Sequence, residues 1–278
     1  MTLPSDSSYA AVEPIVDELA YRLVNHPYGM MVFNGVDPKL AYEVSKVLSG
    51  PKWECRKIGF GYDARFNQIR LRLHNEFGCA KKYMKELWEQ PWASLLPEDA
   101  GEHFIHSGNP RMIDFDGPYK NCMQEPDYCV FPTLSNGRYR FPSIVIQEGT
   151  SDMHTHLIRD KDLWLNGTFG DTRVVILIEV TRIISGVQAV LEIWRKDRIS
   201  QRITLMPVPR EAPASQPDPF ITVGELYGAR GVPDGFDPET KLPLDLMRLR
   251  CTILGTVSWM YGLPPTPNVT EDVDDWGL

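Results

Sequence analysis

The chain has 278 residues, of which 42% are apolar and 24% are charged, as in an ordinary folded domain and unlike a disordered or fibrous protein. No apolar run approaches the roughly 18 residues of a membrane helix, and the N-terminus lacks the pattern of a secretory signal. The net charge of −8 argues against a surface that is basic throughout. The five cysteines are scattered without a CxxC pair, which favours reduced thiols. We therefore expect an intracellular protein, nuclear or cytoplasmic, that makes no contact with a membrane.

The first 52 residues predict a helical appendage. Apolar residues recur at helical spacing over residues 9–24, and Asp37-Pro38 is a start signal for a second helix. Ser49-Gly50-Pro51 marks the end of that helix.

The pattern then changes to a hairpin and a helix. Apolar residues alternate over residues 58–62 and 69–73, on either side of a polar turn at residues 63–67. Helical spacing follows over residues 77–90, and Pro91 stops the helix.

Residues 125–180 predict a strand, a helix and a strand in succession. Residues 144–146 and 174–180 are apolar, β-branched runs typical of buried strands. Between them, residues 153–165 carry apolar side chains at helical spacing, and Asn166-Gly167 follows as a stop. This order is that of a crossover unit at the centre of an α/β domain.

The remainder predicts two alternating strands at residues 188–195 and 202–206, a proline-rich linker at 207–219 and a closing helix at 245–259. We expect the domain to span residues 53–262 and the acidic residues 263–278 to form a disordered tail.

Four segments, in this order, resemble the PD-(D/E)XK nuclease-like superfamily, and in particular its fungal branch of small stand-alone domains. They are Glu-Pro-Asp at 125–127, Phe-Pro-Ser-Ile-Val-Ile-Gln-Glu-Gly-Thr-Ser at 141–151, Leu-Ile-Arg-Asp-Lys-Asp-Leu-Trp-Leu-Asn-Gly at 157–167 and Val-Val-Ile-Leu-Ile-Glu-Val at 174–180. The resemblance implies an α/β (α+β) fold, with a mixed central sheet flanked by helices in a restriction-endonuclease-like core. It also implies a metal-dependent phosphodiesterase, a nuclease that uses Mg²⁺ or Mn²⁺.

Such chemistry needs carboxylates that hold the metal against the scissile phosphate. Asp127 fits the first carboxylate, because it follows Pro126 at the start of an expected strand. Aligned with the family, Gln147 stands at the usual glutamate position, and Glu148 falls on the opposite face of the strand. Either Gln147 substitutes, with Glu148 turned inward by a bulge at Gly149, or the site is degenerate.

Two further site residues are expected on helices. The (D/E)XK spacing places the lysine at Gly149 or Thr150, and neither is basic. Lys161, in the apolar stripe of the 153–165 helix, should instead point toward the sheet. Related branches move their lysine to this helix. Glu76, beside His74, matches a His-Glu pair of the resembling branch and would support the metal. Capping and surface roles are the simpler explanation of this pair.

Two other functions remain open. A degenerate site would leave an inactive nuclease-fold module for binding or assembly, with a protein partner or a second copy of the chain. Nucleic acid, DNA rather than RNA, remains a possible partner because short basic stretches could form a positive face. These stretches are residues 52–57, 65–72, 81–85 and 195–202.

The second of these alternatives is a cupin-like metalloenzyme. His154 and His156, with Asp160 and flanking glycines, approach a cupin motif, in which two histidines of one strand share a face. His103 and His106 could add ligands. This alternative requires residues 151–165 to form a strand.

Overall fold

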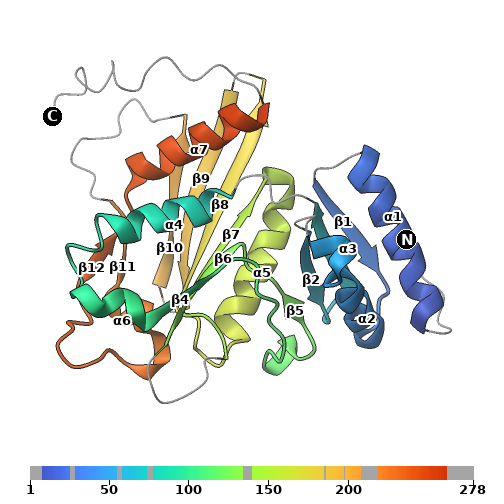
Figure 1. Ribbon diagram of the computed structural model, residues 1–278, viewed down its shortest axis with the longest axis horizontal. Helices are drawn as coiled ribbons and strands as arrows, with labels where there is room; N and C mark the ends of the chain where they lie inside the picture. The colour runs from blue at the N-terminus through green and yellow to red at the C-terminus, as the bar shows by residue number, and fades with distance from the viewer. Residues whose placement is uncertain are drawn as a thin grey trace.

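The computed structural model describes residues 8–25, 29–54, 58–73, 78–133, 140–184, 186–196, 198–207 and 218–261. They form a mixed α/β protein with two main β-sheets (Figure 1). The larger sheet has the strand order β10 (Arg198–Met206), β9 (Gly186–Arg195), β8 (Val174–Ile183), β7 (Ile144–Gly149), β6 (Tyr128–Pro132) and β4 (Phe104–Ser107). The smaller sheet has the order β1 (Gly29–Asn34), β3 (Gln68–Leu73), β2 (Gly59–Asp63) and β5 (Met123–Gln124).

The larger sheet confirms the predicted crossover. β7 and β8 pair in parallel, and α5 (His154–Asn166) connects them, because a parallel pair needs a crossover of this kind. The other pairs of this sheet are antiparallel. The strands expected at 144–146, 174–180 and 188–195 are all present.

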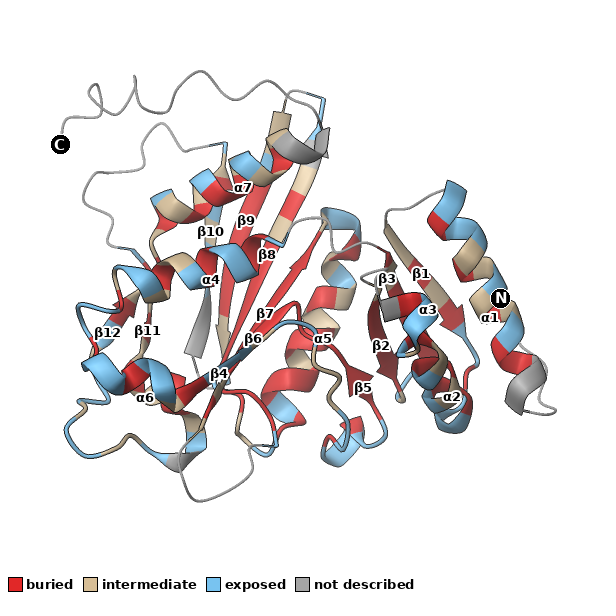
Figure 2. Ribbon diagram, in the orientation of Figure 1, coloured by how far each residue is buried: buried red, intermediate tan, exposed pale blue. Residues whose placement is uncertain are grey.

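Helices cover both faces of the larger sheet, so its central strands are buried (Figure 2). Ile144 and Ile146 of β7 share an apolar cluster with α4 (Cys79–Glu89) and α7 (Leu246–Tyr261). Val145 shares a different cluster with Leu157 and Trp164 of α5. The period of two along β7 therefore assigns alternate side chains to opposite layers.

The N-terminal region combines helices with the smaller sheet. α1 (Ser8–Asn25), α2 (Pro38–Leu48) and the short α3 (Pro51–Glu54) share one apolar cluster with β1, β2 and β3. Asp37 caps α2 as expected, accepting hydrogen bonds from the backbone N–H groups of Lys39 and Leu40. The expectation of a purely helical segment missed β1, whose six residues pair antiparallel with β3.

The C-terminal part adds small elements around the closing helix. β11 (Phe220–Thr222) pairs with β12 (Lys241–Pro243), and α6 (Val223–Tyr227) begins with a capping box between Thr222 and Glu225. Four short 3₁₀ turns complete the described elements: η1 (Glu98–His103), η2 (Gly117–Tyr119), η3 (Ser151–Met153) and η4 (Gly228–Arg230). The predicted tail and most of the proline-rich linker lie outside the described residues. None of the described helices is long and apolar enough to cross a membrane.

Candidate functional site

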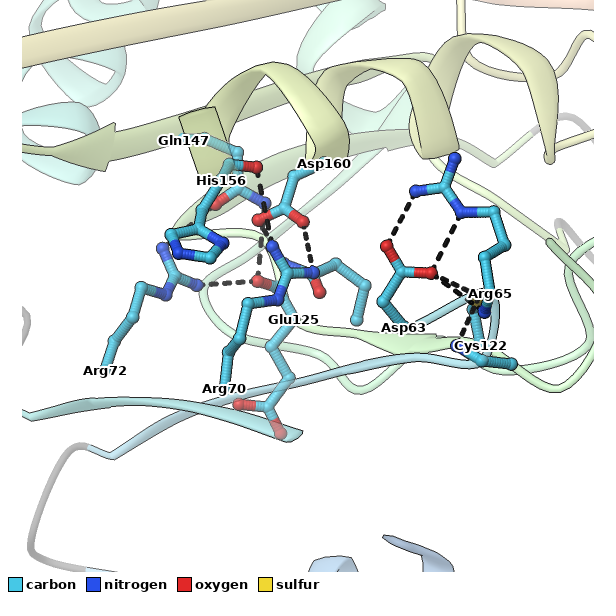
Figure 3. Close-up of polar contacts among 11 residues, drawn as sticks. Asp63, Arg65, Arg70, Arg72, Cys122, Glu125, Gln147, His156 and Asp160 are labelled. Atoms are coloured by element: carbon cyan, nitrogen blue, oxygen red, sulfur yellow. Dashed lines mark hydrogen bonds and ion pairs between the residues drawn. The ribbon is translucent and has the colours of Figure 1, made fainter. Parts of the chain in front are cut away.

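A buried cluster of charged and amide side chains lies where the smaller sheet meets the larger one (Figure 3). β3 contributes two arginines, and the opposing side chains come from β5, from the segment before β6, from β7 and from α5. The side chains are those of Arg70, Arg72, Gln124, Asp127, Gln147 and Asp160, and Glu125 adds its backbone carbonyl.

Arg72 is bonded to three acceptors of this cluster. Its Nη1 donates to Asp127 Oδ2 at 2.6 Å and to Gln147 Oε1 at 2.9 Å. Its Nη2 donates to the backbone carbonyl of Glu125 at 2.8 Å. Burial disfavours the charged form of Arg72, but the attraction of Asp127, Asp160 and Glu125 outweighs it, so the pKa of Arg72 lies above its usual value.

Asp127 and Gln147 both accept hydrogen bonds from the same nitrogen of Arg72. Asp127 lies directly before β6, and its N–H donates to the carbonyl of Ile146 in the neighbouring strand. Its Oδ2 accepts a second hydrogen bond, at 2.7 Å, from the N–H of Glu148. One carboxylate and one neutral amide oxygen therefore face each other across Arg72.

Glu148 points to the other side of the sheet. Its Oε1 accepts a hydrogen bond from the N–H of Ala80, in the first turn of α4. α4 starts after Gly78, which has no side chain to cap the helix, so Glu148 supplies the cap from β7. The inward turn of Glu148 that a bulge would produce is not seen, because β7 pairs with β8 residue for residue from Ile144 to Gly149.

Glu148 is a weak acid in this position. Burial is the main cause, and the charge of Asp127 adds to it, so the pKa of Glu148 rises to about 8, against the opposing effect of the Ala80 N–H. Burial also raises the pKa of Asp127, although Arg72 and the Glu148 N–H favour its charged form. In the described part of the chain, Arg72 pairs with Asp127 and no arginine pairs with Glu148, so at neutral pH the proton of this pair resides on Glu148.

A second ion pair lies beside the first. Arg70 Nη2 lies 2.6 Å from Asp160 Oδ1, and both side chains are almost fully buried. The other carboxylate oxygen of Asp160 accepts a hydrogen bond from Gln124 at 2.9 Å. The guanidinium of Arg70 also reaches the carbonyl of His156 in α5.

Lys161 is not brought to the cluster that contains Asp127 and Gln147. Its ammonium group pairs with Asp162 and lies 4.2 Å from the ring centroid of Trp194 in β9. Successive residues of a helix point about 100° apart, so only one of two neighbours can face the cluster, and Asp160 does so. Lys161 therefore points toward the sheet as expected, but it lies against β9 and not beside Asp127 and Gln147. Glu76 and His74 lie outside the described residues.

The metal that the family resemblance implies does not fit these residues. The oxygens expected to bind it, on Asp127 and Gln147, already accept hydrogen bonds from Arg72, and only Asp127 brings charge. Within the described ranges, no group of three or more His, Cys, Asp or Glu side chains is placed to hold a metal ion.

The cupin geometry is also not formed. Residues 154–166 form a helix, so His154 and His156 do not share the face of a strand. His154 Nδ1 lies 2.8 Å from Glu179 Oε2, and the pKa of His156 is lowered by burial and by Arg70.

Sequence reasoning missed the two arginines. Residues 68–73 alternate polar and apolar side chains, which places Arg70 and Arg72 on one face of β3. That alternation was the available signal, but it is equally typical of a hairpin whose polar face contacts solvent.

Comparison of the chain with models of protein families, with characterised proteins and with solved structures finds no match.

Proposed function

We propose that this protein is a nuclease-fold module that has lost phosphodiester cleavage and acts by binding or assembly. One observation carries the proposal: β7 turns the neutral Gln147 toward Asp127 and uses its acid, Glu148, to cap α4 on the opposite face. A restriction-endonuclease-like core is supported by the order of β6, β7, α5 and β8 and by the parallel pairing of β7 with β8.

The chemistry follows from the charges. Hydrolysis by Mg²⁺ needs a site that attracts a divalent ion and still leaves positions for water and phosphate. Here the single negative charge of Asp127 is matched by the single positive charge of Arg72 at 2.6 Å. The pair has no net charge with which to attract a second cation, and Lys161 is engaged at Asp162 and Trp194.

A cleavage assay tests this proposal. The purified chain is incubated with single-stranded DNA, double-stranded DNA and RNA in Mg²⁺ or Mn²⁺, beside Asp127→Asn as the matched control. We expect the parent to cleave no more than Asp127→Asn on every substrate. Metal-dependent cleavage that is present in the parent and absent in Asp127→Asn would contradict the proposal.

The second candidate is a metal-dependent nuclease that uses Mg²⁺ or Mn²⁺. The placement of Asp127 favours it, because the carboxylate lies before β6 and beside Gln147, where the resemblance puts it. An incoming metal would have to displace Arg72. An active parent would support this candidate, and Lys161→Met would then show whether the lysine contributes.

As a module, the chain would bind a protein, a second copy of itself or nucleic acid, with DNA preferred to RNA.

A further inference from the structure

The guanidinium of Arg72 has the surroundings of a bound cation. Its three acceptors are a carboxylate oxygen, an amide oxygen and a backbone carbonyl, at 2.6, 2.9 and 2.8 Å. Hard divalent cations select the same kinds of oxygen ligand. All three acceptors belong to the segment before β6 or to β7, whereas Arg72 comes from β3 of the smaller sheet.

The neighbouring acid is neutralised in the same way. Asp160 of α5 pairs with Arg70, which precedes Arg72 by two residues on the same face of β3. The smaller sheet thus delivers two positive charges from one strand to two buried carboxylates, Asp127 and Asp160. A carboxylate that is buried and ionised without a partner is costly, so each arginine lowers the cost of keeping the charge of its carboxylate.

We propose that Arg72 is a tethered cation that takes the position of the divalent metal and fastens the smaller sheet to the larger one. The inference rests on the proposed loss of cleavage and gives a physical cause for that loss, which is that Arg72 occupies the position of the metal. Two consequences follow. The parent should not respond to divalent cations, and a metal site should appear when the guanidinium is removed and an acid is restored at residue 147.

Two substitutions make this change with little loss of packing. Arg72→Met keeps an unbranched chain in place of the arginine stem and removes the charge. Gln147→Glu supplies a second carboxylate opposite Asp127. With the carbonyl of Glu125, the cluster then offers three hard oxygen ligands, two of them charged, and water can complete the coordination.

The measurement is the melting temperature with and without Mn²⁺, after removal of metals with a chelator. We expect no shift for the parent. For Arg72→Met/Gln147→Glu we expect a rise of about 2–4 °C at a Mn²⁺ concentration tenfold above Kd, because the ion binds only the folded state. Adding Asp127→Asn to the double variant should abolish the rise.

Gln147→Glu alone is the second variant, and it keeps the guanidinium in place. We expect it to show no response to Mn²⁺, so it remains informative if the double variant does not fold. A Mn²⁺ response in the parent or in Gln147→Glu that depends on Asp127 would overturn the proposal. A folded double variant without any response would overturn it as well.

The two proposals can fail separately. Cleavage by the parent contradicts the loss of catalysis. If the parent is inactive and the double variant shows no Mn²⁺ response, the proposed loss of catalysis is retained and only the proposed role of Arg72 is contradicted.

Discussion

Replacing Arg72 by methionine is expected to lower the free energy of unfolding by about 3–5 kcal/mol, the usual cost of removing one partner of a buried ion pair. Asp127 would lose its counter-charge, whether it stays ionised or takes up a proton, and Gln147 and the carbonyl of Glu125 would each lose a hydrogen bond. Urea denaturation at neutral pH, followed by tryptophan fluorescence, measures the change.

Arg22→Met is the matched control. Arg22 pairs with Glu18 on α1 at 3.0 Å, and its side chain is 48% exposed. Exposed helix pairs contribute only about 0.3–0.5 kcal/mol, so this substitution should be nearly neutral. Equal losses for Arg22→Met and Arg72→Met would show that the buried pair does not stabilise the fold. Arg72→Met/Asp127→Asn should recover part of the loss, because no unpaired charge remains.

The second large effect concerns how the free energy of unfolding changes with pH. The pKa of Glu148 is raised from 4.5 to about 8, so between these values the folded state holds a proton that the unfolded state has lost. Stability from this group is therefore fully present below about pH 4.5 and falls as the pH rises toward 8. We expect the parent to lose on the order of 3 kcal/mol from this group between about pH 5 and 8.

Glu148→Gln isolates this contribution. The amide stays neutral at every pH, and its oxygen can still accept the hydrogen bond from the N–H of Ala80. Urea denaturation of parent and variant across this pH range should give similar stabilities near pH 5, with the parent falling below the variant by pH 8. Parallel curves would show that Glu148 does not change its ionisation in this range.

The elements that carry a strong local pattern could be predicted from the sequence. The apolar runs of β7 and β8, the helical spacing of α5 and the Asp37-Pro38 start of α2 each determine their structure through nearby residues. β1 was missed because its short run, Gly29–Asn34, becomes a strand by pairing with β3, more than thirty residues later.

The site was predictable only in part, for the same reason. Asp127 and Gln147 are adjacent through the pairing of β6 with β7, which the order of the strands suggests. The opposite faces of Gln147 and Glu148 also follow from the period of a strand. The approach of Arg72 joins two sheets, and no local pattern encodes the distance between them. Lys161 points toward the sheet as expected, but it packs on Trp194 of β9, because the apolar stripe of α5 does not decide which of two neighbouring polar residues reaches the cluster.

A crystal structure of the parent grown in Mn²⁺ tests the central claim most directly, since anomalous scattering locates the ion. We expect no Mn²⁺ between Asp127 and Gln147, and the guanidinium of Arg72 bonded to both side chains as described. An anomalous peak about 2.0–2.4 Å from a carboxylate oxygen of Asp127, with Arg72 displaced from Gln147, would contradict it.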